Sequence, residues 1–259
     1  MPSQRQIKIK EKIKDCLRAK FQSYSPETRY MPFHHRLLGK DRMVLYSFIQ
    51  SLNTTFGISI YEPVAVTLAR ERFKVAETQV KPFNEISSKA HQQIQTIMDE
   101  LAIDERELDK PTEIEQIRKV CRTGTLDKVR LTQVDIWLEN YEGELFLIDL
   151  KTVKPNKGNF KEFKRTLLEW TAAELARNSE VVVNTMIGVP YNPYEPKPYE
   201  RWTMKGVLDR DHEVLIAEEL WDFLGGEGTY AELLDAFEQA GIELRPEIDS
   251  YFEKFRYES

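Results

Sequence analysis

The chain has only two cysteines, Cys16 and Cys121, and neither belongs to a Cys-x-x-Cys pair or to a histidine-rich segment. Isolated thiols argue against a disulfide framework and against a structural zinc site, so we expect two buried thiols. Long apolar runs are missing as well: "ELFLI" and "VVV" are far shorter than the roughly 18 residues that a membrane-spanning helix needs. The N-terminus carries no apolar targeting segment, so we expect a cytoplasmic protein.

Internal repeats and low-complexity tracts are also absent from the sequence, although it contains 11 glycines and 12 prolines. This excludes solenoid, collagen-like and disordered chains. The 259 residues, 41% of them hydrophobic, are enough for a sizeable core. We expect a single domain over 1–259, with a mainly helical part at 1–110, a core at 111–208 and an acidic helical part at 209–259.

Charge is distributed unevenly along the chain, which has a net charge of −6. Residues 209–259 contain 15 acids and 4 bases, whereas 5–20 contain seven bases and two acids, and 151–165 contain six bases and one acid. Local basic segments of this kind predict contacts with phosphates despite the negative total. A solvated helix face is the alternative interpretation of each basic run.

Hydrophobic periodicity predicts helices first and strands later in the chain. Helices are expected at 4–21, 41–52, 64–75, 84–108 and 111–124. The segments "LTQVDIWLEN" and "ELFLIDLKTV" predict two strands joined in a hairpin, followed by a helix from an N-cap at Asn159 and by a strand in "EVVVNTMIGVPYNP". Two short helices separated by "GGEG" are expected near the end. This order predicts an α/β fold with a central mixed sheet flanked by helices.

An acid and a lysine two positions apart end the second predicted strand. The acid-x-Lys pattern occurs three times in the sequence, but only Asp149 and Lys151 follow a buried strand. Residues i and i+2 of a strand point to the same side, so these two side chains share one space. An ordinary ion pair at a strand end is one explanation.

Asp135 on the preceding predicted strand favours a different explanation. It lies 14 residues before Asp149, a spacing at which a hairpin brings the two carboxylates together. Two carboxylates at close range repel each other, and a divalent cation between them makes the arrangement favourable. Because all the donors are oxygens, Mg²⁺ is the expected ion, with Lys151 placed to orient a water or to stabilise charge on a phosphate.

Asp135 followed by Asp149-Leu150-Lys151, a helix and another strand resembles the core of the PD-(D/E)XK nuclease superfamily, although Val134 stands where that name has proline. A wider resemblance, to the TdeIII-type family of type II restriction endonucleases, rests on "MPFHHRLLGKDRMVLYSFIQSLNTTFGISIYEPVAVTLA", "VDIWLENYEGELFLIDLKTVKPNKGNFKEFKRTLLEW" and "GVPYNPYEPKPYERWTM". It implies an Mg²⁺-dependent homodimer that cuts both strands of DNA at a short palindromic, GGNCC-like site. Asp135, Asp149 and Lys151 would be catalytic, and the Leu150 carbonyl would join the two aspartates as a metal ligand.

Further residues are weaker candidates for the same activity. Glu113 is a candidate fourth carboxylate, in competition with Glu115 and Glu62 and with a solvated helix face. Phosphate contacts are expected from bases after the motif, base-edge contacts from the segment at 34–36, and further contacts from the loop "PYNPYEPKPYERW". The residues so predicted are Lys154, Lys157, Lys161 and Lys164; His34, His35 and Arg36; and Lys197 and Arg201. Structural or solubilising roles are the alternatives for all of them.

Two other functions are consistent with the sequence. A repair or recombination nuclease would use the same core, and a DNA-binding module without activity would use the acids only as partners of the basic segments. The acidic C-terminal helices are a candidate contact between two copies of the chain.

Overall fold

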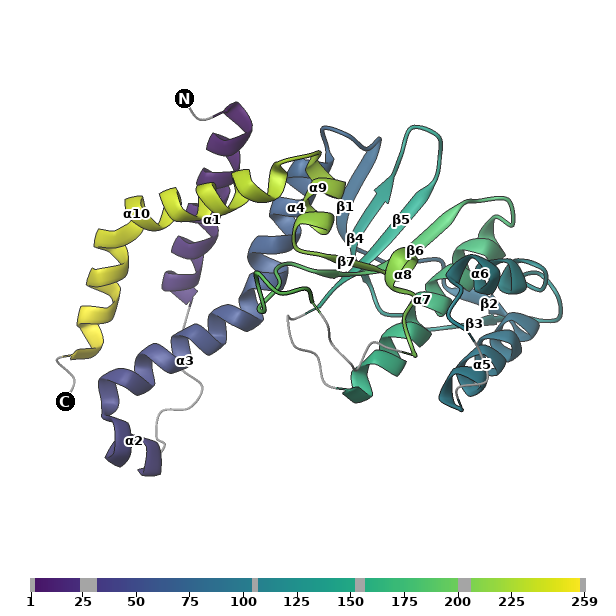
Figure 1. Ribbon diagram of the computed structural model, residues 1–259, viewed down its shortest axis with the longest axis horizontal. Helices are drawn as coiled ribbons and strands as arrows, with labels where there is room; N and C mark the ends of the chain where they lie inside the picture. Colours follow the sequence, from purple (N-terminus) through teal and green to yellow (C-terminus); the bar gives the residue numbers. More distant parts are fainter. Residues whose placement is uncertain (1–2, 24–31, 104–106, 152–156, 200–205, 257–259) are drawn as a thin grey trace. The chain divides into compact units, whose positions relative to one another are not determined.

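The computed structural model describes residues 3–23, 32–103, 107–151, 157–199 and 206–256. The chain forms two compact units, Met1–Thr67 with Gly228–Ser259 and Leu68–Glu227, which we call the helical unit and the sheet unit (Figure 1). The last helix packs with the first, so the helical unit contains both ends of the chain. The single domain over 1–259, with parts at 1–110, 111–208 and 209–259, stays a prediction. None of the described helices combines the length and apolar character needed to cross a membrane.

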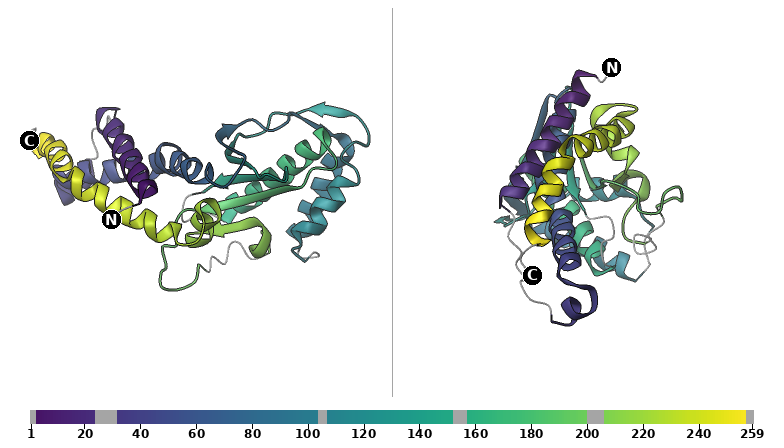
Figure 2. Two further views of the ribbon diagram at one scale, coloured as in Figure 1. Left: turned by 90° about the horizontal axis from the view of Figure 1, so that it is seen from above. Right: turned by 90° about the vertical axis from the view of Figure 1, so that its left-hand side faces the viewer.

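The helical unit is built around the first and last helices of the chain. Its elements are α1 (Gln4–Ser23), α2 (Pro32–Leu38), α3 (Lys40–Thr55), the π-helical η1 (Phe56–Tyr61), the start of α4 (Glu62–Ala69) and α10 (Thr229–Arg256). Figure 2 shows α1 and α10 side by side. Phe21 of α1 stacks on Tyr251 of α10 with ring centroids 4.6 Å apart, and Phe48 of α3 lies 5.4 Å from Tyr251. The helices predicted at 4–21 and 41–52 are confirmed, and packing of this kind stabilises them more than intrinsic propensity does.

The basic run of α1 has acidic partners on α10. Their ion-pair distances run from 2.5 to 2.7 Å, in the pairs Arg5–Glu232, Lys10–Glu243, Lys14–Glu243 and Arg18–Glu247. Hydrogen bonds from Lys10 and Lys14 lower the pKa of Glu243 to about 2. The uneven charge of the sequence is therefore partly balanced within this unit, and the basic run is not simply a solvated face.

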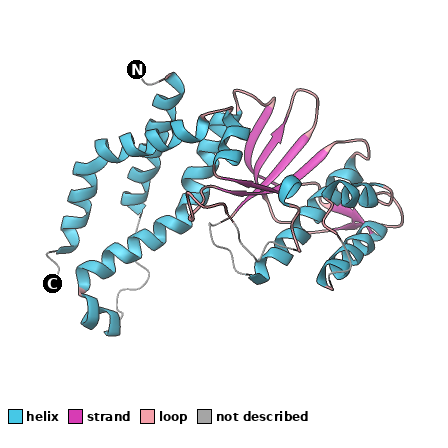
Figure 3. Ribbon diagram, in the orientation of Figure 1, coloured by secondary structure: helices cyan, strands magenta, loops and turns pink. Residues whose placement is uncertain are grey.

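The sheet unit contains a five-stranded mixed sheet, which confirms the predicted α/β architecture (Figure 3). The strand order is β1-β4-β5-β6-β7, with bounds Val75–Val80, Val134–Glu139, Leu145–Leu150, Val183–Val189 and Val214–Ile216. The β1–β4 and β4–β5 pairs are antiparallel, and the β5–β6 and β6–β7 pairs are parallel. The predicted hairpin is β4–β5, whose turn has Gly143 at φ 86°. Apolar runs had predicted β4, β5 and β6, whereas β1 and β7 were missed.

Different helices cover the two faces of this sheet. On one face, Phe146 of β5 packs against Phe223 of α9 (Glu218–Gly225), with ring centroids 5.3 Å apart. On the other, Thr185 of β6 lies 3.2 Å from Thr171 of α7 (Lys157–Arg177), hydroxyl to hydroxyl. Thr185 is the register partner of Leu147, and side chains alternate along β5, so Asp149 and Lys151 belong to the α7 face.

The remaining elements correct several predicted boundaries. They are β2 (Glu85–Ser87), α5 (Ser88–Ala102), α6 (Lys110–Arg118), β3 (Leu126–Lys128) and α8 (Arg210–Glu213). The helix predicted at 84–108 is wrong at its start, because the Ser87 side chain accepts a hydrogen bond from the Ala90 amide and so begins α5 at residue 88. The helix predicted at 64–75 ends at Ala69, and α7 begins at Lys157, two residues before the predicted N-cap. Cys16 and Cys121 are free thiols, half-buried and buried respectively.

Candidate active site

Asp135 and Asp149 lie opposite each other on neighbouring strands. In the antiparallel β4–β5 pair, Ile136 is the partner of Ile148, so the next position along each strand places the two aspartates side by side. Directly opposed residues of an antiparallel pair project from the same face. The structure therefore brings together the two carboxylates that the hairpin spacing predicted.

Hydrogen bonds to both oxygens orient the Asp135 carboxylate. Its Oδ2 accepts from the Leu150 amide at 2.8 Å, and its Oδ1 accepts from Gln79 Nε2 at 3.0 Å. Gln79 lies opposite Asp135 on β1 with φ 56°, a left-handed conformation that is uncommon for a residue other than glycine. Gln79 was not predicted as a site residue, because a neutral polar residue on an edge strand belongs to no catalytic pattern.

Asp149 is a buried carboxylate with an ammonium beside it. Only 8% of its side chain is exposed, and its Oδ1 lies 2.6 Å from Lys151 Nζ. Burial raises the pKa of Asp149 to about 7, the attraction of Lys151 opposes that rise, and the neighbouring Asp135 adds to it. The negative charge of Asp149 is thus disfavoured where it stands, and a cation bound between the two carboxylates would stabilise it.

Lys151 is held at both its backbone and its side chain. Its amide donates to the Gly188 carbonyl at 2.9 Å, which extends the parallel β5–β6 pairing beyond Leu150. A Cβ at Gly188 would approach Leu150 Cδ2 to 2.9 Å, so glycine permits this close approach. The ammonium lies 4.7 Å from the centroid of the Phe163 ring on α7.

The donor set fits a hard divalent cation. Asp135 and Asp149 supply carboxylate oxygens, which Mg²⁺ prefers, and a cation between them would relieve the repulsion that helps to raise the pKa of Asp149. Within the described ranges, no three His, Cys, Asp or Glu side chains gather to hold a metal. A ligand set of two aspartates with the Leu150 carbonyl therefore stays a prediction.

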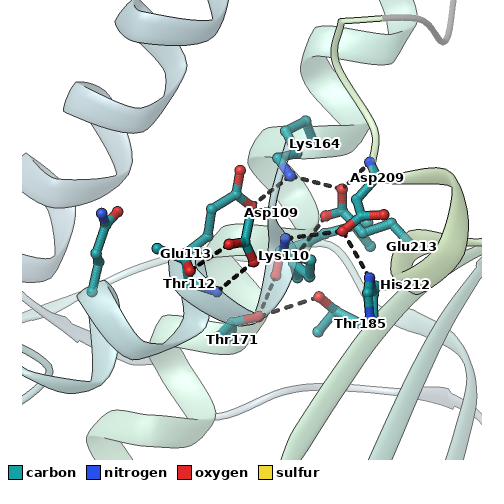
Figure 4. Close-up of polar contacts among 12 residues, drawn as sticks. Asp109, Lys110, Thr112, Glu113, Lys164, Thr171, Thr185, Asp209, His212 and Glu213 are labelled. Carbon is teal, nitrogen blue, oxygen red and sulfur yellow. Dashed lines mark hydrogen bonds and ion pairs between the residues drawn. The ribbon is translucent and has the colours of Figure 1, made fainter. Parts of the chain in front are cut away.

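Glu113 does not join these aspartates. It lies wholly buried on α6, where its Oε2 is 2.5 Å from Lys164 Nζ (Figure 4). Lys164 also lies 2.7 Å from Glu213 Oε2, and Glu213 in turn lies 2.8 Å from Lys110 Nζ. We call Lys110, Glu113, Lys164 and Glu213 the buried ion cluster. The phosphate contact predicted for Lys164 is wrong for this structure, because none of its side chain is exposed.

Most of the other predicted DNA contacts remain predictions. His34 and Arg36 are exposed on α2 in the helical unit, and Lys161 and Lys197 are exposed in the sheet unit. Lys154 and Arg201 lie outside the described residues, as do the side chains of His35 and Lys157.

The pKa of Asp149 gives the site a pH dependence that can be measured without substrate. Below pH 7 a proton on Asp149 would compete with the predicted Mg²⁺. If that ion binds here, we expect its affinity to fall about tenfold for each pH unit and to level off above pH 7. Isothermal titration with Mg²⁺ at about pH 6, 7 and 8 measures this. The control is Glu169→Gln, which removes another carboxyl whose pKa burial raises and should leave the profile unchanged. An affinity that is constant over this range contradicts the prediction.

Comparison with known proteins gives one consistent class. Residues 1–241 match the family described as "Type II restriction endonuclease, HinfI". The type II restriction enzyme HgiEI of Herpetosiphon aurantiacus is 28% identical over 234 residues, which cover 87% of this chain and 82% of the relative. HgiCII of the same organism is 25% identical over 221 residues, covering 84% and 80%, and MjaII of Methanocaldococcus jannaschii is 28% identical over 249 residues, covering 85% and 65%. The similarity extends over nearly the whole chain.

Proposed function

Because the chain belongs to the HinfI family of type II restriction endonucleases, we propose that it cleaves double-stranded DNA at a short palindromic, GGNCC-like site by Mg²⁺-dependent phosphodiester hydrolysis on a PD-(D/E)XK core. The convergence of Asp135, Asp149 and Lys151 on the α7 face is the observation that supports this mechanism. The TdeIII-type assignment within the class is likewise a proposal.

Each of the three residues has a defined part in the proposed reaction. Asp135 is oriented by the Gln79 side chain and the Leu150 amide. Asp135 and Asp149, which is buried beside it, would hold the cation together with the Leu150 carbonyl. When bound, Mg²⁺ supplies a Lewis acid and charge neutralisation at the scissile phosphate. The Lys151 ammonium orients the attacking water or stabilises charge on the phosphate. In-line attack then leaves a 5′-phosphate and a 3′-hydroxyl.

A palindromic target implies two copies of the active site. Cutting both strands symmetrically is the work of a two-fold dimer, so the proposed active form is a homodimer on DNA. The acids Glu232, Glu243 and Glu247 of α10 already pair with α1 of the same chain, which makes these three carboxylates poor candidates for the contact between copies.

Digestion of a plasmid of known sequence tests the proposal. We expect discrete fragments in Mg²⁺, none in EDTA, and ends that map by sequencing to one short palindrome with 5′-phosphates. Cleavage of branched DNA with no plasmid bands would instead support a repair or recombination nuclease. DNA binding with no cleavage under any divalent ion would support a non-catalytic module, in which the 2.6 Å Asp149–Lys151 contact is only an ion pair.

A further inference from the structure

The Lys151 ammonium has two partners of different chemistry. Asp149 Oδ1 is 2.6 Å away, and the ammonium lies over the Phe163 ring, 4.7 Å from its centroid. An ammonium within about 6 Å of an aromatic centroid is attracted by the negative face of the ring. The side chain of Lys151 is 26% exposed, so this attraction acts in a partly desolvated position.

The Phe163 ring is itself held in place by its neighbours on α7. Phe160, which is 1% exposed, meets the Phe163 ring edge to face at 5.6 Å. Lys164, the next residue, is fixed inside the buried ion cluster by Glu113 and Glu213 (Figure 4). The ring therefore belongs to a rigid part of the helix, whose position is set by buried contacts on either side of Phe163.

We propose that Phe163 is a positioning residue for Lys151, an inference that rests on the proposed function. A cation bound at Asp149 competes with the ammonium for that carboxylate, and the lysine then loses an electrostatic partner. The neutral ring does not ligate Mg²⁺, so its hold on the ammonium persists when the metal is bound. Fewer side-chain conformations remain open to Lys151, and its charge stays at the reacting phosphate.

Substitutions at Phe163 test this through the split between kcat and KM. Phe163→Leu keeps an apolar side chain but removes the ring face, so we expect kcat to fall roughly 5-fold to 30-fold with KM changed less than about twofold. Phe163→Tyr keeps the ring, so its kcat should stay within about twofold of the wild-type value. The matched control is Phe146→Leu, which removes a half-buried ring that packs with Phe73 and Phe223 and lies away from Lys151.

A spectroscopic readout reports the contact independently of cleavage. In protein labelled with ¹³Cε-lysine, ring current should shift the Lys151 ε-methylene resonance upfield, and Lys151→Arg identifies that signal by removing it. We expect the upfield shift to be lost in Phe163→Leu and kept in Phe163→Tyr and Phe146→Leu, with and without Mg²⁺.

The outcomes separate the inference from the function on which it rests. Loss of the shift in Phe163→Leu with unchanged kcat overturns the positioning role and leaves the nuclease proposal standing. A fall in kcat without any change in the shift, or an equal fall in Phe146→Leu, also overturns it, because the effect would then come through the fold. Wild-type cleavage by Lys151→Ala would overturn the part proposed for Lys151 in the reaction, whatever the spectrum shows. The absence of any cleavage by the wild type would overturn the proposed function itself.

Discussion

Replacing Asp149 with asparagine is expected to lower the rate of DNA cleavage by roughly 10³-fold, or about 4 kcal/mol of activation free energy. Asparagine keeps the shape of the side chain but removes the charge that neutralises a divalent cation and pairs with Lys151 at 2.6 Å. Single-turnover cleavage in Mg²⁺ measures the loss. DNA affinity, measured by fluorescence anisotropy in EDTA, should stay within about threefold of the wild type.

Stability distinguishes this role from that of a structural ion pair. Burial raises the pKa of Asp149 to about 7, so at pH 8 the folded chain carries a carboxylate that its surroundings disfavour. The asparagine variant should therefore be at least as resistant to unfolding at pH 8 as the wild type. Asp127→Asn, an exposed acid on β3 of the same unit, is the control and should cut normally. An Asp149→Asn protein that is less stable but fully active would contradict the catalytic assignment.

The second large effect is on stability: Lys164→Met should lower the free energy of unfolding of the sheet unit by about 3–5 kcal/mol. Methionine fills similar space but leaves the two buried carboxylates, Glu113 and Glu213, with only one cation of the cluster, Lys110, which pairs with Glu213. Burial already raises the pKa of Glu113, and it lowers that of Lys110, so the cluster does not tolerate the loss of a charge easily. Urea unfolding followed by tryptophan fluorescence is a suitable measurement, because all four tryptophans lie between residues 68 and 227.

A neighbouring substitution serves as the control for Lys164→Met. Arg165→Met removes a cation of the same helix whose Nη2 donates to the Gln95 side chain in an exposed contact, and it should change stability by no more than about 0.5 kcal/mol. In the double variant Lys164→Met with Glu113→Gln, the cluster keeps one acid and one base, and part of the lost stability should return. A loss below about 1 kcal/mol for Lys164→Met alone would show that the cluster does not depend on its charges being matched.

The sequence predicted those parts of the fold whose signal is local. The apolar runs of β4, β5 and β6 and the long amphipathic pattern of α7 each lie within one short window of sequence, so these elements were recognised with nearly correct bounds. Strand β1, "VAETQV", has polar residues on both faces, as an edge strand tolerates, and its pattern was not distinctive. The π-helical η1 and the length of α10 depend on packing in the helical unit, which no short window of sequence contains.

The candidate site likewise contains residues that a local pattern predicted and residues that only the structure identifies. Asp135, Asp149 and Lys151 were brought together by register alone, which follows from one hairpin. The carboxylate partners of Lys164 lie 51 and 49 residues away along the chain, so the sequence pattern did not show them. Lys164 was therefore predicted to contact phosphate, although its side chain is wholly buried. Gln79 and Phe163 carry no charge and fit no motif, and only their distances to Asp135 and Lys151 identify them.

The pairing of α1 with α10 bears on how DNA binding should respond to salt. Association with DNA gains entropy as mobile cations leave the phosphates, and log K falls by roughly 0.9 per phosphate neutralised for each unit of log salt concentration. Four cations of α1 already form ion pairs with carboxylates of the same chain, those of Glu232, Glu243 and Glu247 on α10. To neutralise phosphates, these cations must first be released from acids that would then repel the same DNA. The salt dependence of binding should therefore be set by the bases of the chain other than these four.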